Sequence, residues 1–259
     1  MRSCISRASL FDAKGFAVTV SPAVLKDLAP TGRLRAAINH GNTILAQKHA
    51  DGSLGGVTVA LARELGKRLN VPVDLVPYDA AGKVFAAIPQ LAWDVAFLAI
   101  EPVRAAEIEF TAPYVLIEGY FMVPNESALR TPSEVDREGI RIAVAKGAAY
   151  DLFLSRTFKH ATLQRAPTGP EALQMMLREK LEVAAGVKQH VTKFAAEHPG
   201  LRVMDQRFMA IEQAMGTLKG RLDGVAYLKP FIEEMKASGM IAAELKASGQ
   251  SDAAVAPRA

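Results

Sequence analysis

The chain has 259 residues, of which 50% are hydrophobic and 22% are charged, and its formal net charge is +4. This composition is typical of a folded protein and excludes disorder as the main state, while the length allows one large domain or two lobes. There is no dense block of Lys and Arg, so the small positive excess predicts a solvated basic surface and no nucleic-acid partner.

The N-terminal segment carries the single cysteine, Cys4, which excludes an intrachain disulfide and a cysteine-based zinc cluster. Residues 1–28 show little periodicity and are predicted to form a loose arm with a helical turn near 23–27. Asp12 and Lys14 split the apolar part of this segment, so it does not resemble a secretory signal. No stretch is apolar for long enough to span a bilayer, and together these features favour a cytoplasmic location.

The first part of the chain alternates predicted strands and helices. Val57, Leu61, Leu65 and Leu69 are spaced four apart, which predicts an amphipathic helix that ends near Asn70. A β-α-β-α-β order predicts parallel strands with crossover helices. The elements expected here are a strand at 34–39, a helix at 57–69, a strand at 71–76, a helix at 83–88 and a strand at 95–100.

A second strand–helix set follows, and two further strands are predicted to cross between the sets at 119–124 and 210–217. Two sets with two crossings predict an α/β protein with two lobes around a cleft. The first lobe is expected to comprise residues 29–120 plus 216–259, and the second residues 121–215. The other expected elements are strands at 140–145, 161–166, 183–186 and 201–204 and helices at 150–158, 170–179, 189–197, 223–238 and 241–248.

The strand at 95–100 is followed directly by Glu101, Pro102, Val103 and Arg104. In open α/β sheets the ligand lies beyond the carboxyl ends of the strands. Arg104 is therefore predicted to point toward a bound anion, and its planar guanidinium suits a carboxylate. Replacing Arg104 is predicted to remove ligand binding and to leave the fold intact.

The segment Glu101–Arg104, followed by Ile108–Tyr114, resembles the T-P-E-R…V-D-F-S-x-P-Y signature of the bacterial extracellular solute-binding proteins of family 3. These are the two-lobed, amino-acid-type receptors of ABC importers. The resemblance spans roughly residues 34–249 and implies a periplasmic-binding-protein-like type II fold. It also implies that Arg104 binds the ligand's α-carboxylate, and that the protein is a monomer with an ABC permease as partner.

The sequence departs from the family pattern at several expected ligand contacts. Glu101, next to Ile100, stands where the family has a threonine that helps to hold the ligand's ammonium. A carboxylate there would bind a cation or neutralise Arg104, and the sequence leaves both open. Asn42 lies in a loop that lacks the family's aromatic Y-P-P-F, so the clamp on the ligand's side chain is absent.

The second lobe departs from the family as well. Gly147, Ala148 and Ala149 replace a G-T-T/S segment, whose backbone N–H groups face an anion at a helix N-terminus. Tyr150 could supply the missing hydroxyl or simply pack. Many relatives have an aspartate for the α-ammonium at the position of Val187, which Lys188 and Gln189 follow. The site is therefore predicted to suit an acid without that amine contact, or an amine held by Glu101. The residues expected at the hinge are Glu118, Tyr120, Glu212 and Gln213.

The expected function is binding of a small carboxylate, an amino acid or a related organic acid, by closure of the two lobes. The alternative is an enzyme on the same fold that resembles cyclohexadienyl dehydratases, with Glu101, Glu118 or Glu212 as general acid. A LysR-type effector module is a third possibility, but the N-terminal arm is too short for a winged helix. The histidines lack metal-binding spacing, and His190 is expected to decorate a helix end. No metal or cofactor is expected.

Overall fold

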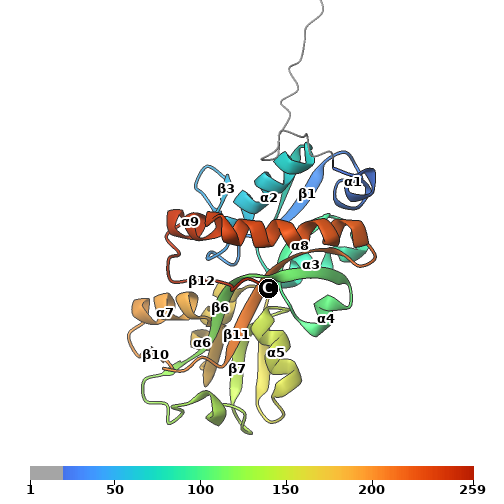
Figure 1. Cartoon of the computed structure of the whole chain (residues 1–259). Coiled ribbons are helices and arrows are strands. Elements are labelled where there is room, and N and C mark those ends of the chain that lie inside the picture. The colour runs from blue at the N-terminus through green and yellow to red at the C-terminus, as the bar shows by residue number, and fades with distance from the viewer. Residues whose placement is uncertain (1–19) are drawn as a thin grey trace, which may run out of the picture.

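Strands and helices alternate along two lobes in the computed structural model, which describes residues 20–259 (Figure 1). In the first lobe, β1 (Leu34–Asn39) lies between β4 (Val73–Tyr78) and β5 (Val95–Ala99) and runs parallel to both. Every residue of β5 is buried, as expected for a strand covered on both faces. Helix α2 (Val57–Leu69) buries its predicted apolar stripe and ends where Asn70 adopts a left-handed conformation.

The second lobe repeats this arrangement. Strand β7 (Arg141–Ala145) lies between β8 (Thr162–Ala166) and β9 (Val183–Val187) and is parallel to both. Each strand leads into a helix, and in Figure 1 these helices lie in the lower lobe: α5 (Ala149–Thr157), α6 (Gly169–Glu179) and α7 (Lys188–Glu197). The predicted α/β class and the predicted order of elements are confirmed in both lobes.

Two long antiparallel strands join the lobes, which confirms the predicted type II architecture. Strand β11 (Met209–Leu218) pairs with β5 in the first lobe, and β6 (Ile108–Pro124) pairs with β9 in the second. One continuous sheet runs in the order β4-β1-β5-β11-β6-β9-β7-β8, with two short strands also paired to β6, while a separate hairpin pairs the two short strands at 47–48 and 54–55. Strand β6 begins at Ile108, whereas the sequence predicted a start at residue 119. Proline normally interrupts a strand, but Pro113 lies where the register between β6 and β11 shifts, and a strand tolerates proline at such an irregularity.

The packed structure begins at residue 22, within the segment 1–28 that was predicted to be a loose arm. Helix α1 (Pro22–Leu28) lies against α8 (Leu222–Ala237), where Leu28 is fully buried and Asp27 accepts a hydrogen bond from the Gly224 amide. Residues 22–28 are therefore not part of a loose arm. Cys4 and the rest of the predicted arm lie outside the described residues. The remaining elements are β2 (Gln47–Lys48), β3 (Leu54–Gly55), α3 (Ala81–Ala86), η1 (Ile88–Gln90), α4 (Pro102–Ala105), η2 (Pro132–Glu134), β10 (Leu201–Val203), α9 (Met240–Ala247) and β12 (Ala254–Val255).

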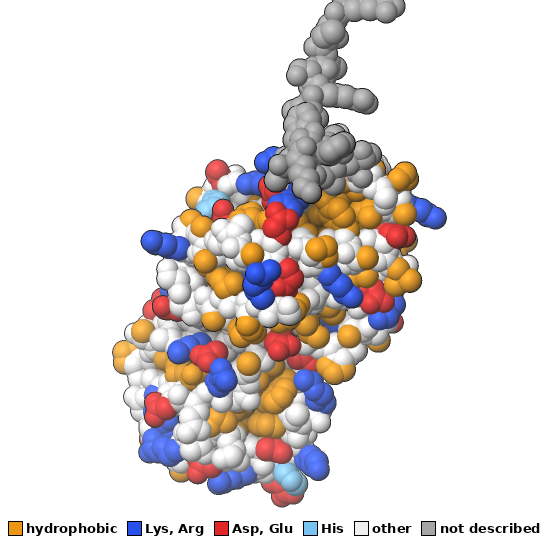
Figure 2. Space-filling view, in the orientation of Figure 1, with side chains coloured by type: hydrophobic (Ala, Val, Ile, Leu, Met, Phe, Trp, Pro, Cys, Tyr) orange, Lys and Arg blue, Asp and Glu red, His pale blue; other side chains and the backbone are white. Residues whose placement is uncertain are grey.

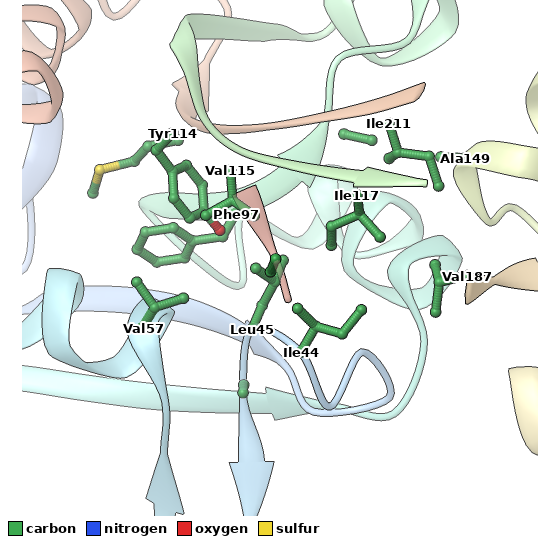
Figure 3. Close-up of a cluster of buried hydrophobic side chains, with 14 of the residues drawn as sticks. Ile44, Leu45, Val57, Phe97, Tyr114, Val115, Ile117, Ala149, Val187 and Ile211 are labelled. Carbon is green, nitrogen blue, oxygen red and sulfur yellow. The ribbon is translucent and has the colours of Figure 1, made fainter. Parts of the chain in front are cut away.

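The hydrophobic core continues from one lobe to the other along the crossing strands. Figure 3 shows Ile44 of the first lobe, Ile117 and Ile211 of the crossing strands, and Ala149 and Val187 of the second lobe, which all belong to one buried cluster. The apolar packing therefore places the ends of β7 and β9 beside the first lobe.

The surface carries charges of both signs. On the face that Figure 2 shows, Lys and Arg side chains alternate with Asp and Glu across both lobes. Among residues 20–259, no helix combines the length and the apolar character that crossing a bilayer requires. The residue boundaries assigned above to the two lobes stay a prediction, because β6 and β11 run through both.

Candidate functional site

Two adjacent hollows lie between the lobes, an inner and an outer chamber that share lining residues. The inner chamber has a volume of about 70 Å³, and its polar wall consists of Asn39, Asn42, Asp79, Lys146, Tyr150 and Gln213. The outer chamber has a volume of about 460 Å³ and shares Gly41, Asp79 and His190 with the inner one. Strands β1, β4, β7 and β9 all end at this place, so the chambers lie where the carboxyl ends of the strands in both lobes meet.

The N-terminus of α5 forms one side of the inner chamber. Gly147 has a positive φ of 70°, and its amide donates to Asp151 at 2.8 Å. Ala148, Ala149 and Tyr150 line the chamber. The amides of Ala149 and Tyr150 have no acceptor among residues 20–259, as the first turn of a helix leaves its N–H groups without intrahelical partners. Burial raises the pKa of the Tyr150 hydroxyl, which keeps it neutral. This side of the chamber therefore offers hydrogen-bond donors to an anion.

Lys146, a positively charged residue, also lines this chamber. It follows β7 directly, its side chain is exposed, and it has no carboxylate partner among the described residues. Asp79, which follows β4, is the one carboxylate of the polar wall, and Lys83 of α3 already pairs with it at 2.8 Å. Lys146 is therefore the charged lining residue of this chamber that has no ion-pair partner among residues 20–259, which favours an anion there.

Arg104 does not line the inner chamber. Its guanidinium is fully buried and donates to the carbonyls of Ala99 at 3.0 Å and Gly147 at 2.8 Å, while Nε has no partner within residues 20–259. Burial lowers the pKa of Arg104 to about 10, although the nearby charge of Glu101 opposes that shift. Arg104 and Gly147 therefore meet across the lobes as predicted, but through a carbonyl and not a shared anion. Direct contact between Arg104 and a ligand stays a prediction.

Glu101 has a partner that the sequence did not indicate. Its buried carboxylate forms an ion pair with Arg156 of α5, so it links the first lobe to the second. Glu101 does not line the inner chamber, so its carboxylate would not contact the ammonium group of a ligand bound there. Ile100 lies outside the chamber as well, and its amide donates to the Glu212 carbonyl at 2.9 Å.

The lobes also touch through backbone atoms at two glycines. A Cβ atom on Gly82 of α3 would lie 2.6 Å from the Lys146 carbonyl oxygen and 3.3 Å from the Gly147 Cα. A Cβ atom on Gly147 would lie 2.9 Å from the Gly82 Cα. Only residues without side chains allow such an approach, so Gly82 and Gly147 set how closely the two lobes can come together.

Several predicted ligand and hinge residues lie away from both chambers. Glu118 pairs with Lys188 at 3.6 Å and with Arg207 at 2.8 Å, and Gln189 lies in the same separate hollow. The Lys188 ammonium also lies 5.3 Å from the centre of the buried Tyr120 ring. These contacts join β6 to α7. On β11, Glu212 is exposed whereas Gln213 lines the inner chamber, because successive side chains of a strand face opposite ways.

His190 lines the chambers, a role that the sequence did not indicate. It lies in the first turn of α7, lines both chambers, and forms a hydrogen bond of 2.9 Å between its Nε2 and Thr43 Oγ1 of the first lobe. Burial, with a smaller contribution from Lys193, lowers the pKa of its imidazole and favours the neutral form. His190 therefore lies at a helix end as predicted, but it also faces the cleft, because β9 ends at the cleft and α7 begins there.

Three functional residues missed in the sequence share a simple signal. Lys146, Asp79 and His190 each follow the carboxyl end of a parallel strand, directly or within one helical turn. The rule that selected Arg104 therefore also applies to them. Within the described part of the chain, no group of three or more His, Cys, Asp and Glu side chains could hold a metal ion.

Solved structures with this fold include several amino-acid-binding proteins. The substrate-binding protein AbpA of an amino acid ABC transporter from Streptococcus pneumoniae, bound to L-arginine, is 16% identical with a TM-score of 0.73, over 86% of this chain and 97% of that chain. A putative binding component of an ABC transporter from Wolinella succinogenes, complexed with lysine, is 23% identical with a TM-score of 0.69, over 83% and 94%. The ancestral amino acid-binding protein AncCDT-1, a precursor of cyclohexadienyl dehydratase, is 19% identical with a TM-score of 0.71, over 86% and 98%.

Identities this low show the fold alone. A search of curated protein sequences gave no significant match. The sequence itself, however, matches a family over residues 34–247, which covers both lobes and both crossing strands. The chain therefore belongs to the bacterial extracellular solute-binding proteins, family 3, as the segments Glu101–Arg104 and Ile108–Tyr114 predicted.

Proposed function

We propose that the protein binds a small organic acid in the inner chamber and acts as the solute-binding component of an ABC-type importer. The main support is that Lys146 and the acceptor-free amides of Ala149 and Tyr150 belong to the second-lobe wall of one chamber between the lobes. A carboxylate there would accept hydrogen bonds from backbone amides at the positive end of α5 and from an ammonium. The importer role rests on the family.

Closure of the lobes on the ligand is the proposed mechanism. The wall around Lys146 belongs to the second lobe, whereas Asn39, Asn42 and Asp79 belong to the first, so a ligand in the chamber touches both. A ligand shifts the balance toward the closed form only if it binds that form better. The contacts of Arg104 with Gly147 and of Glu101 with Arg156 add to the stability of the closed form.

The enzymatic alternative has less support. Of the three carboxylates proposed as general acids, Glu101 pairs with Arg156, Glu118 pairs with Lys188 and Arg207, and Glu212 is exposed on β11. None of the three lines the inner chamber. A general acid must come within hydrogen-bond reach of the reacting group, so binding without turnover is the function that this geometry favours.

A thermal-shift and calorimetry screen of small acids tests the proposal. We expect organic acids to raise the melting temperature of the protein and Lys146→Met to weaken their binding about tenfold or more, since a hydrogen bond to a charged group contributes about 1.5–3 kcal/mol. Lys48→Met, at an exposed position in β2, is the matched control and should bind as the wild type does. Undiminished acid binding by Lys146→Met would remove the proposed anion site.

A further inference from the structure

The two chambers differ in size in a way that limits the ligand. By the usual measure, one water needs about 10–15 Å³ of cavity, so the inner chamber of about 70 Å³ holds about five water-sized groups. A carboxylate with one or two neighbouring atoms fits that space, but the whole of a long amino acid does not. The rest of a larger ligand would extend into the outer chamber, which has a volume of about 460 Å³.

The wall of the outer chamber in the second lobe is largely apolar. Pro170 and Leu173 of α6 and Phe194 of α7 line it. Leu173 and Phe194 are almost completely buried and belong to the core that α6 and α7 share with β9. Such a wall is fixed by core packing, and it would gain from covering an apolar group.

The charged side chains around the outer chamber do not favour a cation. Its two carboxylates already have partners four residues away in the chain: Asp79 pairs with Lys83 at 2.8 Å, and Glu197 with Lys193 at 3.9 Å. Lys193 itself lines the chamber, together with His40 and His190. A guanidinium or ammonium entering this space would meet the Lys193 ammonium, and each carboxylate among the lining residues already has a lysine partner.

We infer that the ligand is a carboxylic acid whose body is uncharged and apolar, such as an aryl or branched alkyl group, which lies against Leu173 and Phe194 while the carboxylate occupies the inner chamber. This inference rests on the proposed function and adds the substrate class. It sets the chain apart from the neighbours solved with arginine and lysine, because their ligands carry a second positive charge.

Calorimetry with four probes tests the inference: 3-phenyllactate, lactate, arginine and lysine. We expect wild-type protein to bind phenyllactate at least about tenfold more tightly than lactate, which shares the head group but lacks the ring, and more tightly than either cationic amino acid. Leu173→Ala should reduce the ratio of phenyllactate affinity to lactate affinity by about twofold, because it removes the small apolar area that Leu173 exposes to the chamber.

A second variant keeps the test valid if Leu173→Ala does not fold. Gln174→Glu changes an exposed side chain of the outer chamber at nearly constant volume. It should weaken phenyllactate binding and strengthen arginine binding. Equal affinities for lactate and phenyllactate, or tighter binding of arginine by the wild type, would overturn the inference and leave the proposed function standing. Failure of both lactate and phenyllactate to bind would instead overturn the proposed function.

Discussion

Replacing Gly82 by alanine is expected to prevent ligand-induced closure without weakening the fold. The added methyl group would lie 2.6 Å from the Lys146 carbonyl oxygen across the lobe interface. Overpacking of this kind costs about 1–3 kcal/mol, which corresponds to roughly 5–150-fold in the closure equilibrium. Within α3 itself, alanine is favoured over glycine by about 1 kcal/mol. Small-angle scattering should therefore show no compaction with the best acid of the screen, and calorimetry should show weaker binding.

Gly224→Ala is the matched control, because its methyl group would collide within one lobe. It would meet Leu28 Cδ2 at 2.9 Å and Asp27 Cβ at 3.0 Å, both on α1, which packs on the same helix. This variant should melt at a lower temperature and still become compact with ligand. If Gly82→Ala protein becomes as compact as the wild type and binds equally well, the lobes do not close at this glycine contact.

Replacing Arg104 by methionine is expected to lower the free energy of unfolding by about 2 kcal/mol while the fold stays intact, as predicted from the sequence. The carbonyls of Ala99 and Gly147 would each lose a buried donor, at a cost of about 1–3 kcal/mol per group. Relief from burying a charge offsets part of this loss. Methionine retains most of the apolar volume, so a cavity contributes little. Urea denaturation measures the difference.

Arg33→Met serves as the reference for Arg104→Met. Arg33 forms an exposed ion pair with Asp74 on the surface, and exposed pairs contribute about 0–1 kcal/mol. Its loss should therefore hardly change the denaturation midpoint. If Arg104→Met is as stable as the wild type but no longer binds acids, the guanidinium acts on the ligand itself and not through the carbonyls.

Much of the fold follows from patterns that the sequence displays locally. The four-residue spacing in α2 predicts a helix with one buried face, and the short apolar run of β5 predicts a strand buried on both faces. The predicted bounds of both agree with the structure to within a few residues. The start of β6 was missed because Pro113 argues against a strand when its partner is unknown. Its place at the register shift with β11 depends on residues about a hundred positions away in the chain. The packing of α1 on α8 is long-range in the same way.

The site could be predicted less completely than the fold, for a physical reason. Proximity of Arg104 to the Gly147 segment followed from strand ends and the family motif, but the atoms that meet depend on the lobe geometry. Lys188 was predicted to contact a ligand because it follows Val187, the position at which many relatives have an aspartate for the α-ammonium. It pairs with Glu118 instead, since the first residue of α7 points away from the cleft and His190 points into it. Side chains two positions apart in an α-helix point in directions about 200° apart around the helix axis, because each residue turns the helix by about 100°.

The most direct test of the central claim compares an acid with its own amide. X-ray scattering with calorimetry on the wild-type protein, with 3-phenyllactate and with 3-phenyllactamide, isolates the carboxylate because the two compounds otherwise match. The geometry of Lys146 and the α5 amides predicts that the acid binds with one-to-one stoichiometry and makes the protein more compact, while the amide does neither. Equal binding and compaction with the amide would contradict recognition of a carboxylate between the lobes.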